Sequence, residues 1–176
     1  MIFIDTVIQG ILLGGLYALF ATGLSLIFGV MRLVNLAHGD FMILGAFAVL
    51  IGVEALGLPV LLSAILAGFF MFILGYVLQR YLLNRTLGHD ILPPLLVTFG
   101  LSIILQNGML ETFSADTQRL DMGAISVASI PLGGGLAVGV IPFMTLISAI
   151  IVILALNWKF YRAALGRAFR ATYENP

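Results

Sequence analysis

Residues 24–40 read LSLIFGVMRLVNLAHGD, and within this stretch an apolar run gives way to polar and charged residues. These are Arg32, Asn35, His38 and Asp40, and the chain turns apolar again directly after them. Polar groups at the end of a membrane span, or inside one, are costly unless they face a cavity or a partner. The stretch therefore predicts a solute pathway or a binding site at a membrane-spanning helix.

The composition is that of an integral membrane protein. Of 176 residues, 61% are hydrophobic and 9% are charged, and the mean hydropathy is +1.17. Soluble domains carry about 25% charged residues. Cysteine is absent, and His38 and His89 are far apart, so we expect no disulfide framework, no metal centre and no cofactor. The first residues lack a basic segment and a cleavage site, so we expect the first apolar run to be a retained span.

Windows free of charge predict an all-α, polytopic transmembrane helix bundle of about five spans, since a bilayer crossing needs about 20 apolar residues. We expect these spans at residues 7–30, 41–58, 60–79, 91–111 and 140–157. Residues 115–138 contain Pro131 and three consecutive glycines, which break helices, so we expect an irregular external segment there.

The basic residues predict an external N-terminus. In that orientation seven of them fall on the cytoplasmic side and only Arg119 lies outside, as the positive-inside rule requires. This bias allows two placements of residues 31–40 relative to the membrane. These residues form either a cytoplasmic turn or a re-entrant turn that places Arg32 below the membrane surface.

Two roles are open for the polar residues of this stretch. A helix interrupted here would expose backbone groups, and discontinuous transporter helices use such groups to bind polar solutes. Alternatively, Asn35 caps one helix end and Asp40 begins the next helix in an ordinary turn. His38 is either a hydrogen-bonded structural residue or a proton relay, although neighbouring spans offer no acidic or histidine partner. The candidates for lining the substrate pathway are Asn35, His38, Asp40, Gln106 and Asn107.

Three segments resemble permeases of the high-affinity branched-chain amino acid ABC transporters. They are GLSLIFGVMRLVNLAHGDFMILGA at 23–46, TFGLSIILQN at 98–107 and LGRAFRATYEN at 165–175. The resemblance implies an inner-membrane permease subunit that imports branched-chain amino acids or a similar small polar solute. Its implied partners are a second permease subunit, cytoplasmic ATP-binding subunits and a periplasmic substrate-binding protein. Urea, short amides and aromatic acids remain open as substrates.

The resemblance also implies how the chain is organised. Residues 1–176 form a transmembrane permease domain, and because family members are longer, we expect this to be its N-terminal portion. Residues 158–176 begin the cytoplasmic coupling loop, where one short helix would present its side chains to an ATPase. The coupling candidates are Gly166, Arg167, Arg170, Glu174 and Asn175. A basic lipid anchor is the alternative for this tail. ATP hydrolysis is expected in a partner, since the chain carries no G-x-x-x-x-G-K-[ST] run.

Two other classes of membrane protein are weaker alternatives. Gly23-Leu24-Ser25 resembles the nucleophile turn of intramembrane serine proteases, but Ile27 breaks the G-x-S-x-G pattern. A small channel or an assembly subunit is the other alternative, and no selectivity filter is recognisable in the sequence. The sequence therefore favours a transport subunit that is not itself an enzyme.

Overall fold

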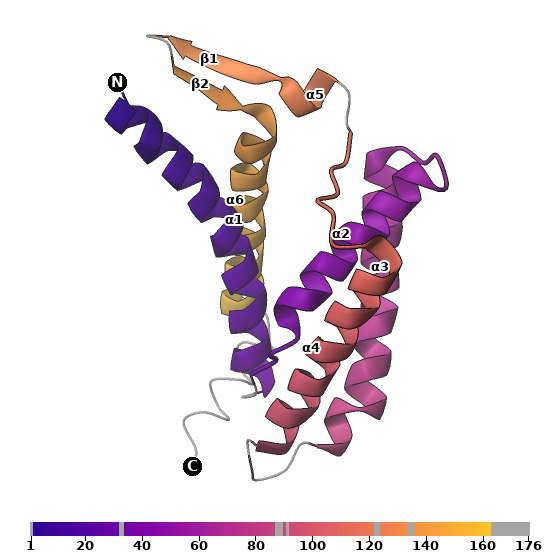
Figure 1. The fold of residues 1–176 in the computed structure, drawn as a ribbon. Coiled ribbons are helices and arrows are strands. Elements are labelled where there is room, and N and C mark those ends of the chain that lie inside the picture. The colour runs from indigo at the N-terminus through magenta and orange to yellow at the C-terminus, as the bar shows by residue number, and fades with distance from the viewer. Residues whose placement is uncertain are drawn as a thin grey trace. The chain divides into compact units, whose positions relative to one another are not determined.

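The computed structural model describes residues 2–31, 34–86, 90, 92–121, 124–133 and 136–162 (Figure 1). The chain divides into two compact units. One unit comprises Met1–Gly23 and Gly123–Pro176, and the other comprises Leu24–Met122. We call them the outer-segment unit and the central unit. The elements in chain order are α1 (Ile2–Met31), α2 (His38–Glu54), α3 (Val60–Tyr81), η1 (Leu83–Arg85), α4 (Leu92–Phe113), α5 (Ala124–Val127), β1 (Ser129–Gly133), β2 (Leu136–Gly139) and α6 (Val140–Arg162).

The described residues confirm a polytopic helical bundle, with one difference from the expected spans. Four helices are long and apolar enough to cross a membrane, namely α1, α3, α4 and α6. The expected span at 41–58 is instead α2, which runs from His38 to Glu54 and has 17 residues. At 1.5 Å per residue it is about 26 Å long. A bilayer core is about 30 Å thick, so α2 is the one long helix that falls short of a full crossing among the described residues.

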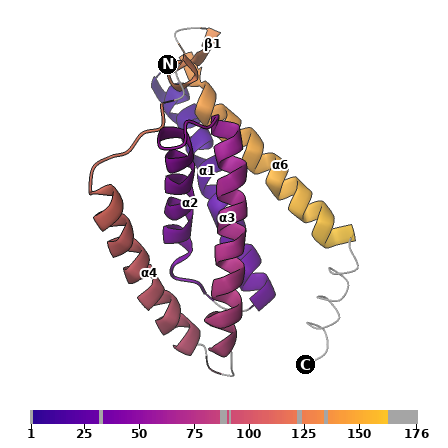
Figure 2. The ribbon, with the colours of Figure 1, turned by 90° about the vertical axis from the view of Figure 1, so that its right-hand side faces the viewer.

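In the central unit, α2 packs against both α3 and α4, and Figure 2 shows α2 beside α3. The chain reverses between α2 and α3 at Gly57, whose φ of +63° is costly for residues with a side chain. Just beyond this reversal the two helices approach closely. A Cβ built on Gly52 would lie 2.8 Å from both Cβ and Oγ of Ser63.

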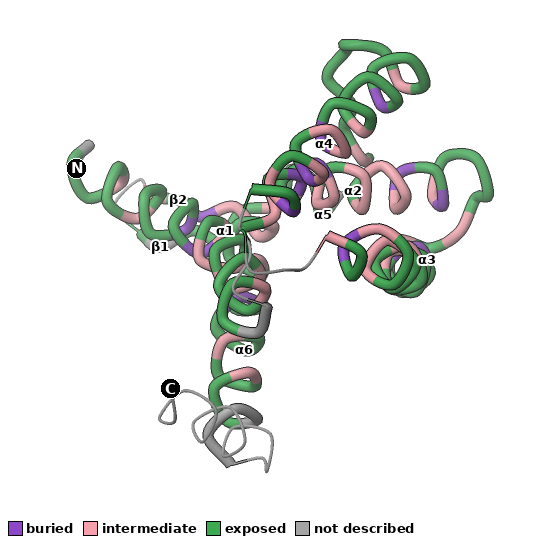
Figure 3. Tube along the Cα trace, turned by 90° about the horizontal axis from the view of Figure 1, so that it is seen from below, coloured by how far each residue is buried: buried purple, intermediate pink, exposed green. Residues whose placement is uncertain are grey.

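In the central unit many large apolar side chains are exposed, and several polar side chains are buried. The outward surface of α3 is exposed along its length (Figure 3) and carries large apolar side chains such as Leu61, Phe69 and Phe72. The buried side chains include Asp40, Ser63, Thr98 and Ser102. Lipid tails are as apolar as leucine, so helices in a membrane associate through close packing of small residues and through polar contacts. The exposed surface of α3 is therefore of the kind that faces lipid.

The outer-segment unit contains a regular hairpin where the sequence analysis expected irregular structure. Residues 115–138 were expected to lack regular elements, but α5 and the antiparallel strands β1 and β2 form there. Ser129 pairs with Gly139 and Ile130 with Val138, and the register shifts between Pro131 and Gly133. The helix-breaking residues do stop a helix, yet Gly133, at φ +85°, also permits the chain reversal of a hairpin.

The tight contact at Gly52 yields a prediction about stability. Gly52→Val should lower the free energy of unfolding by about 1–3 kcal/mol, because the new side chain has to push α2 away from Ser63. Thermal unfolding of the purified protein in detergent measures this. Gly68→Val is the matched control, since a Cβ at Gly68 meets nothing within 4 Å. Equal unfolding temperatures for the two variants would contradict the close approach.

Candidate functional site

A hydrogen-bonded turn leads into α2. Oδ1 of Asn35 accepts the backbone N–H of Ala37 at 3.0 Å, and the backbone oxygen of Asn35 accepts the N–H of His38 at 3.2 Å. A side chain that accepts from the backbone two residues on forms an Asx turn, which can replace a helical turn. We call residues 35–38 the polar turn. Asn35 thus fixes the direction in which the chain enters α2.

Thr98 attaches the polar turn to α4. The N–H of Leu36 donates to Oγ1 of Thr98 at 3.3 Å, and the Thr98 hydroxyl donates to the carbonyl of Leu95 at 3.1 Å. The Thr98 side chain is 0% exposed. Three successive amides, those of residues 36, 37 and 38, therefore have hydrogen-bond partners although none of them is in a helical ladder.

The polar turn lies well inside the length of the neighbouring helices. Thr98 is six residues from the start of α4, which is about 9 Å at 1.5 Å per residue. Figures 1 and 2 both show α2 starting partway along α3 and α4. The polar turn therefore lies beside the interior of α4 and not beside its first residue.

Asp40 forms a second attachment between α2 and α4. Its Oδ2 accepts a hydrogen bond from the hydroxyl of Ser102, and its Oδ1 accepts from Nε2 of Gln106 at 3.1 Å. Gln106 also donates to Oγ of Ser102 at 3.1 Å. The Asp40 residue is 8% exposed and stands in the first turn of α2, where the helix dipole favours a negative charge. The carboxylate is thus held by two uncharged donors and a helix end.

The family model for the permease component of the branched-chain amino acid transport system matches residues 6–176. The chain belongs to this permease family. Membership makes it an integral membrane transport component and not an enzyme, so the serine protease alternative falls away.

Two curated relatives show how much of a permease the chain covers. It is 26% identical to the high-affinity branched-chain amino acid transport system permease protein BraD of Pseudomonas aeruginosa, over 98% of this chain and 60% of BraD. It is 27% identical to the permease protein LivH of Escherichia coli K12, over 60% of this chain and 37% of LivH. The chain thus spans about 60% of the length of BraD. No solved structure matches it.

The permease brings together some of the residues that the sequence analysis selected and separates others. Asp40 and Gln106 are hydrogen-bonded to each other, while Asn35 and His38 line one pocket. Asn107 stands apart, because it is exposed and its Nδ2 donates to the carbonyl of Ile103 one turn back in α4 at 2.7 Å. The coupling residues Gly166, Arg167, Arg170, Glu174 and Asn175 lie outside the described residues.

Thr98 and Ser102 also belong to this site, although they were not among the residues selected from the sequence. A signal for them exists, because Thr98, Ser102 and Gln106 follow one another at intervals of four on α4. Residues four apart share a helix face, so this pattern marks a polar stripe along an otherwise apolar span. The stripe is the surface that receives both the polar turn and Asp40.

The attachment at Thr98 can be tested with a matched pair of threonines on α4. Thr98→Val should lower the free energy of unfolding by about 1 kcal/mol, because it leaves the part-buried N–H of Leu36 without its acceptor. Thr112→Val is the control, since the exposed Thr112 hydroxyl donates to the Gly108 carbonyl within its own helix at 2.7 Å. Thermal unfolding in detergent compares the two. Destabilisation of the same size in both variants would show that the bond to Leu36 contributes nothing.

Proposed function

We propose that this permease is a subunit of an ABC importer that passes branched-chain amino acids across the bacterial inner membrane. The names of BraD and LivH support this substrate class. The observation that carries the proposal is the polar turn, which is held on α4 at a depth where a lipid-facing chain would be continuous helix. A pathway for a zwitterion needs hydrogen-bonding groups at such a depth.

Each candidate residue has a distinct part in this proposal. Asn35 and His38 are the groups that meet the solute, since both line a pocket. Asp40 and Gln106 position the polar turn by joining the start of α2 to the middle of α4. Asn107 adds a polar group on an exposed face of α4, where a water-filled path would solvate it.

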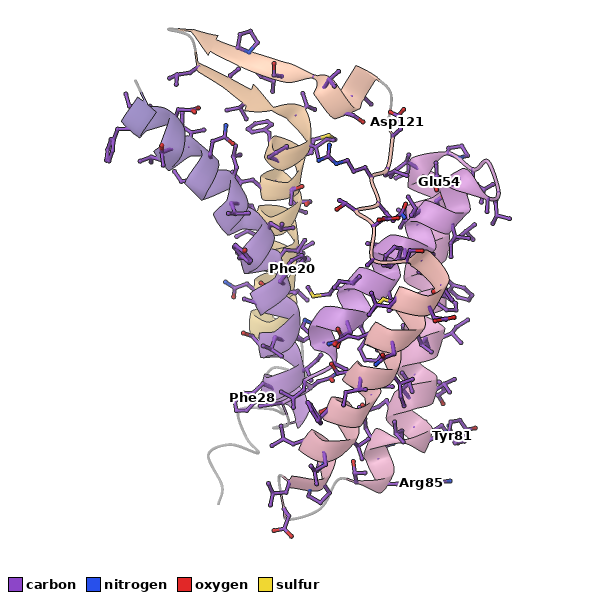
Figure 4. The ribbon with its side chains drawn as sticks, in the orientation of Figure 1. Phe20, Phe28, Glu54, Tyr81, Arg85 and Asp121 are labelled. Atoms are coloured by element: carbon purple, nitrogen blue, oxygen red, sulfur yellow. The ribbon has the colours of Figure 1, made fainter. Side chains whose placement is uncertain are left out.

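The proposed orientation places the N-terminus outside the cell. Within the central unit, Figure 4 shows Glu54 and Asp121 at one end and Tyr81 and Arg85 at the other. The positive-inside rule makes the end that carries Arg80 and Arg85 the cytoplasmic one. The start of α4 then faces the cytoplasm, and the polar turn lies in the inner half of the membrane.

A substitution at Asn35 separates its part in the pathway from its part in the turn. Asn35→Ser keeps a side-chain oxygen that can accept the N–H of Ala37 but removes the amide group. We expect membrane abundance of the complete importer to stay within about twofold, and leucine uptake per copy to fall about tenfold, equivalent to one lost hydrogen bond of about 1.4 kcal/mol. Asn35→Ala should lower both. Unchanged uptake per copy in Asn35→Ser would reduce Asn35 to a structural residue.

The partners proposed for the permease are a second permease subunit, cytoplasmic ATP-binding subunits and a periplasmic binding protein. An ATPase can drive the permease only through a contact that differs between its states. We assign that contact to residues 166–175, with Arg167 and Arg170 as bidentate donors and Glu174 as an acceptor, flanked by Gly166 and Asn175.

Charge-preserving variants test this contact against a lipid anchor. Arg167→Lys combined with Arg170→Lys should leave membrane insertion intact and lower substrate-stimulated ATP hydrolysis of the reconstituted importer, because lysine cannot bind a carboxylate bidentately. Glu174→Ala should also lower it, although the tail becomes more positive. Full ATPase stimulation in both variants would favour an anchor that binds anionic lipid through charge alone.

A further inference from the structure

The end of α3 carries an arginine that is held against a tyrosine of the preceding turn. Nη1 of Arg80 donates a hydrogen bond to the hydroxyl oxygen of Tyr76 at 2.6 Å. Cζ of Arg80 lies 5.9 Å from the centre of the Tyr76 ring, at the outer limit of a cation–π contact. Both residues are exposed. We call these two side chains the Arg80–Tyr76 pair.

The Arg80–Tyr76 pair keeps donors that its internal hydrogen bond does not use. A guanidinium has five N–H donors in a planar fork, and the bond to Tyr76 occupies one of them. The Tyr76 hydroxyl accepts that bond through its oxygen and can still donate its own proton. Within the part of the chain that the structure describes, Arg80 forms no ion pair with a carboxylate. A phosphate group fits this arrangement, because it can accept two parallel hydrogen bonds from a guanidinium and a further one from a hydroxyl.

An apolar stripe leads away from the pair along the same face of α3. Phe69, Phe72 and Ile73 precede Tyr76 at intervals of three and four, and residues with this spacing share a helix face. Their exposed fractions are 64%, 71% and 47%. We call these three side chains the α3 stripe. Helices that pack on one another in a membrane prefer small residues at the contact, so this stripe of large side chains favours an acyl chain over a second helix.

We propose that the Arg80–Tyr76 pair and the α3 stripe together bind a phospholipid, with its phosphate on the pair and an acyl chain along the stripe. The order of the groups agrees, since a phospholipid joins an anionic phosphate to long apolar chains. The depth also agrees. Arg80 is five residues from the end of the apolar segment Val60–Arg85, so it lies toward the headgroup edge of a span. In the proposed orientation this edge is the cytoplasmic leaflet, where basic side chains attract anionic lipid. The lipid site does not depend on which solute the permease passes.

Photochemical cross-linking tests whether a lipid occupies this face. The complete importer is purified in detergent and titrated with phosphatidylglycerol that carries a diazirine in its acyl chain, and the labelled peptides are identified by mass spectrometry. We expect saturable labelling of α3. Unlabelled phosphatidylglycerol should compete, whereas diacylglycerol, which lacks the phosphate, and inorganic phosphate, which lacks the chains, should not. Equal competition by diacylglycerol would show that only an apolar surface is labelled and would overturn the proposal.

Variants of the pair test the proposed phosphate contacts. Arg80→Gln should weaken the apparent affinity of α3 for the lipid about tenfold, which corresponds to about 1.4 kcal/mol. Tyr76→Phe should weaken it about threefold, because it removes one uncharged donor. Arg80→Lys should fall between the unsubstituted importer and Arg80→Gln, since lysine keeps the charge but cannot bind a phosphate bidentately.

Two matched controls separate this site from general attraction to anionic lipid. Arg85→Gln removes the same charge five residues later, and Tyr81→Phe removes a hydroxyl from the next turn. Both should leave the labelling of α3 unchanged. Equal weakening in Arg80→Gln and Arg85→Gln would mean that charge alone recruits the lipid, and the proposed site would be wrong. Labelling that never reaches α3 would show that another part of the importer covers this face, and it would overturn the proposal as well.

Discussion

A backbone amide outside a helical ladder needs another acceptor, and this constraint governs how the chain enters α2. The amides of the polar turn lie outside such a ladder beside Thr98, and each of them is paired in another way. Asn35 supplies two acceptors, one from its side chain and one from its backbone, and Thr98 supplies the third. A donor of this kind that is buried without a partner costs about 1–3 kcal/mol, so these bonds make the interruption of the helix possible.

The length of α2 follows from that interruption. Because α2 begins at the level of the polar turn, 17 residues bring it to Glu54, beside the reversal at Gly57 that leads into α3. Its two ends are held by different interactions. Hydrogen bonds from Ser102 and Gln106 hold the first turn through Asp40, whereas close packing of Gly52 on Ser63 holds the last turns. Aromatic stacking of Phe47 on Phe113 secures the helix between these points.

Sequence patterns predicted the apolar helices well, because span length and charge are set by the bilayer itself. The helices α3, α4 and α6 each begin within one residue of the position expected from the sequence. The expected span at 41–58 was wrong, because apolar composition does not show where along its neighbouring helices a helix starts. The hairpin after residue 128 was missed because proline and glycine stop a helix without specifying what replaces it. Asp40 and Gln106 were selected by polarity alone, and their pairing required the register of α2 against α4, which only tertiary contacts determine.

The two kinds of attachment on α2 respond differently to a polar solute. At the contact of Gly52 with Ser63 the helices are held by close packing, and the Ser63 hydroxyl is buried there without a hydrogen-bond partner. Hydrogen bonds at the other end are exchangeable, since water can offer both donors and acceptors and a carboxylate can offer acceptors. Their net strength is also modest, about 0.5–1.5 kcal/mol each, although leaving them unmade is costly. The first turn of α2 is therefore held by bonds that polar groups can exchange, whereas its last turns are held by close packing against Ser63.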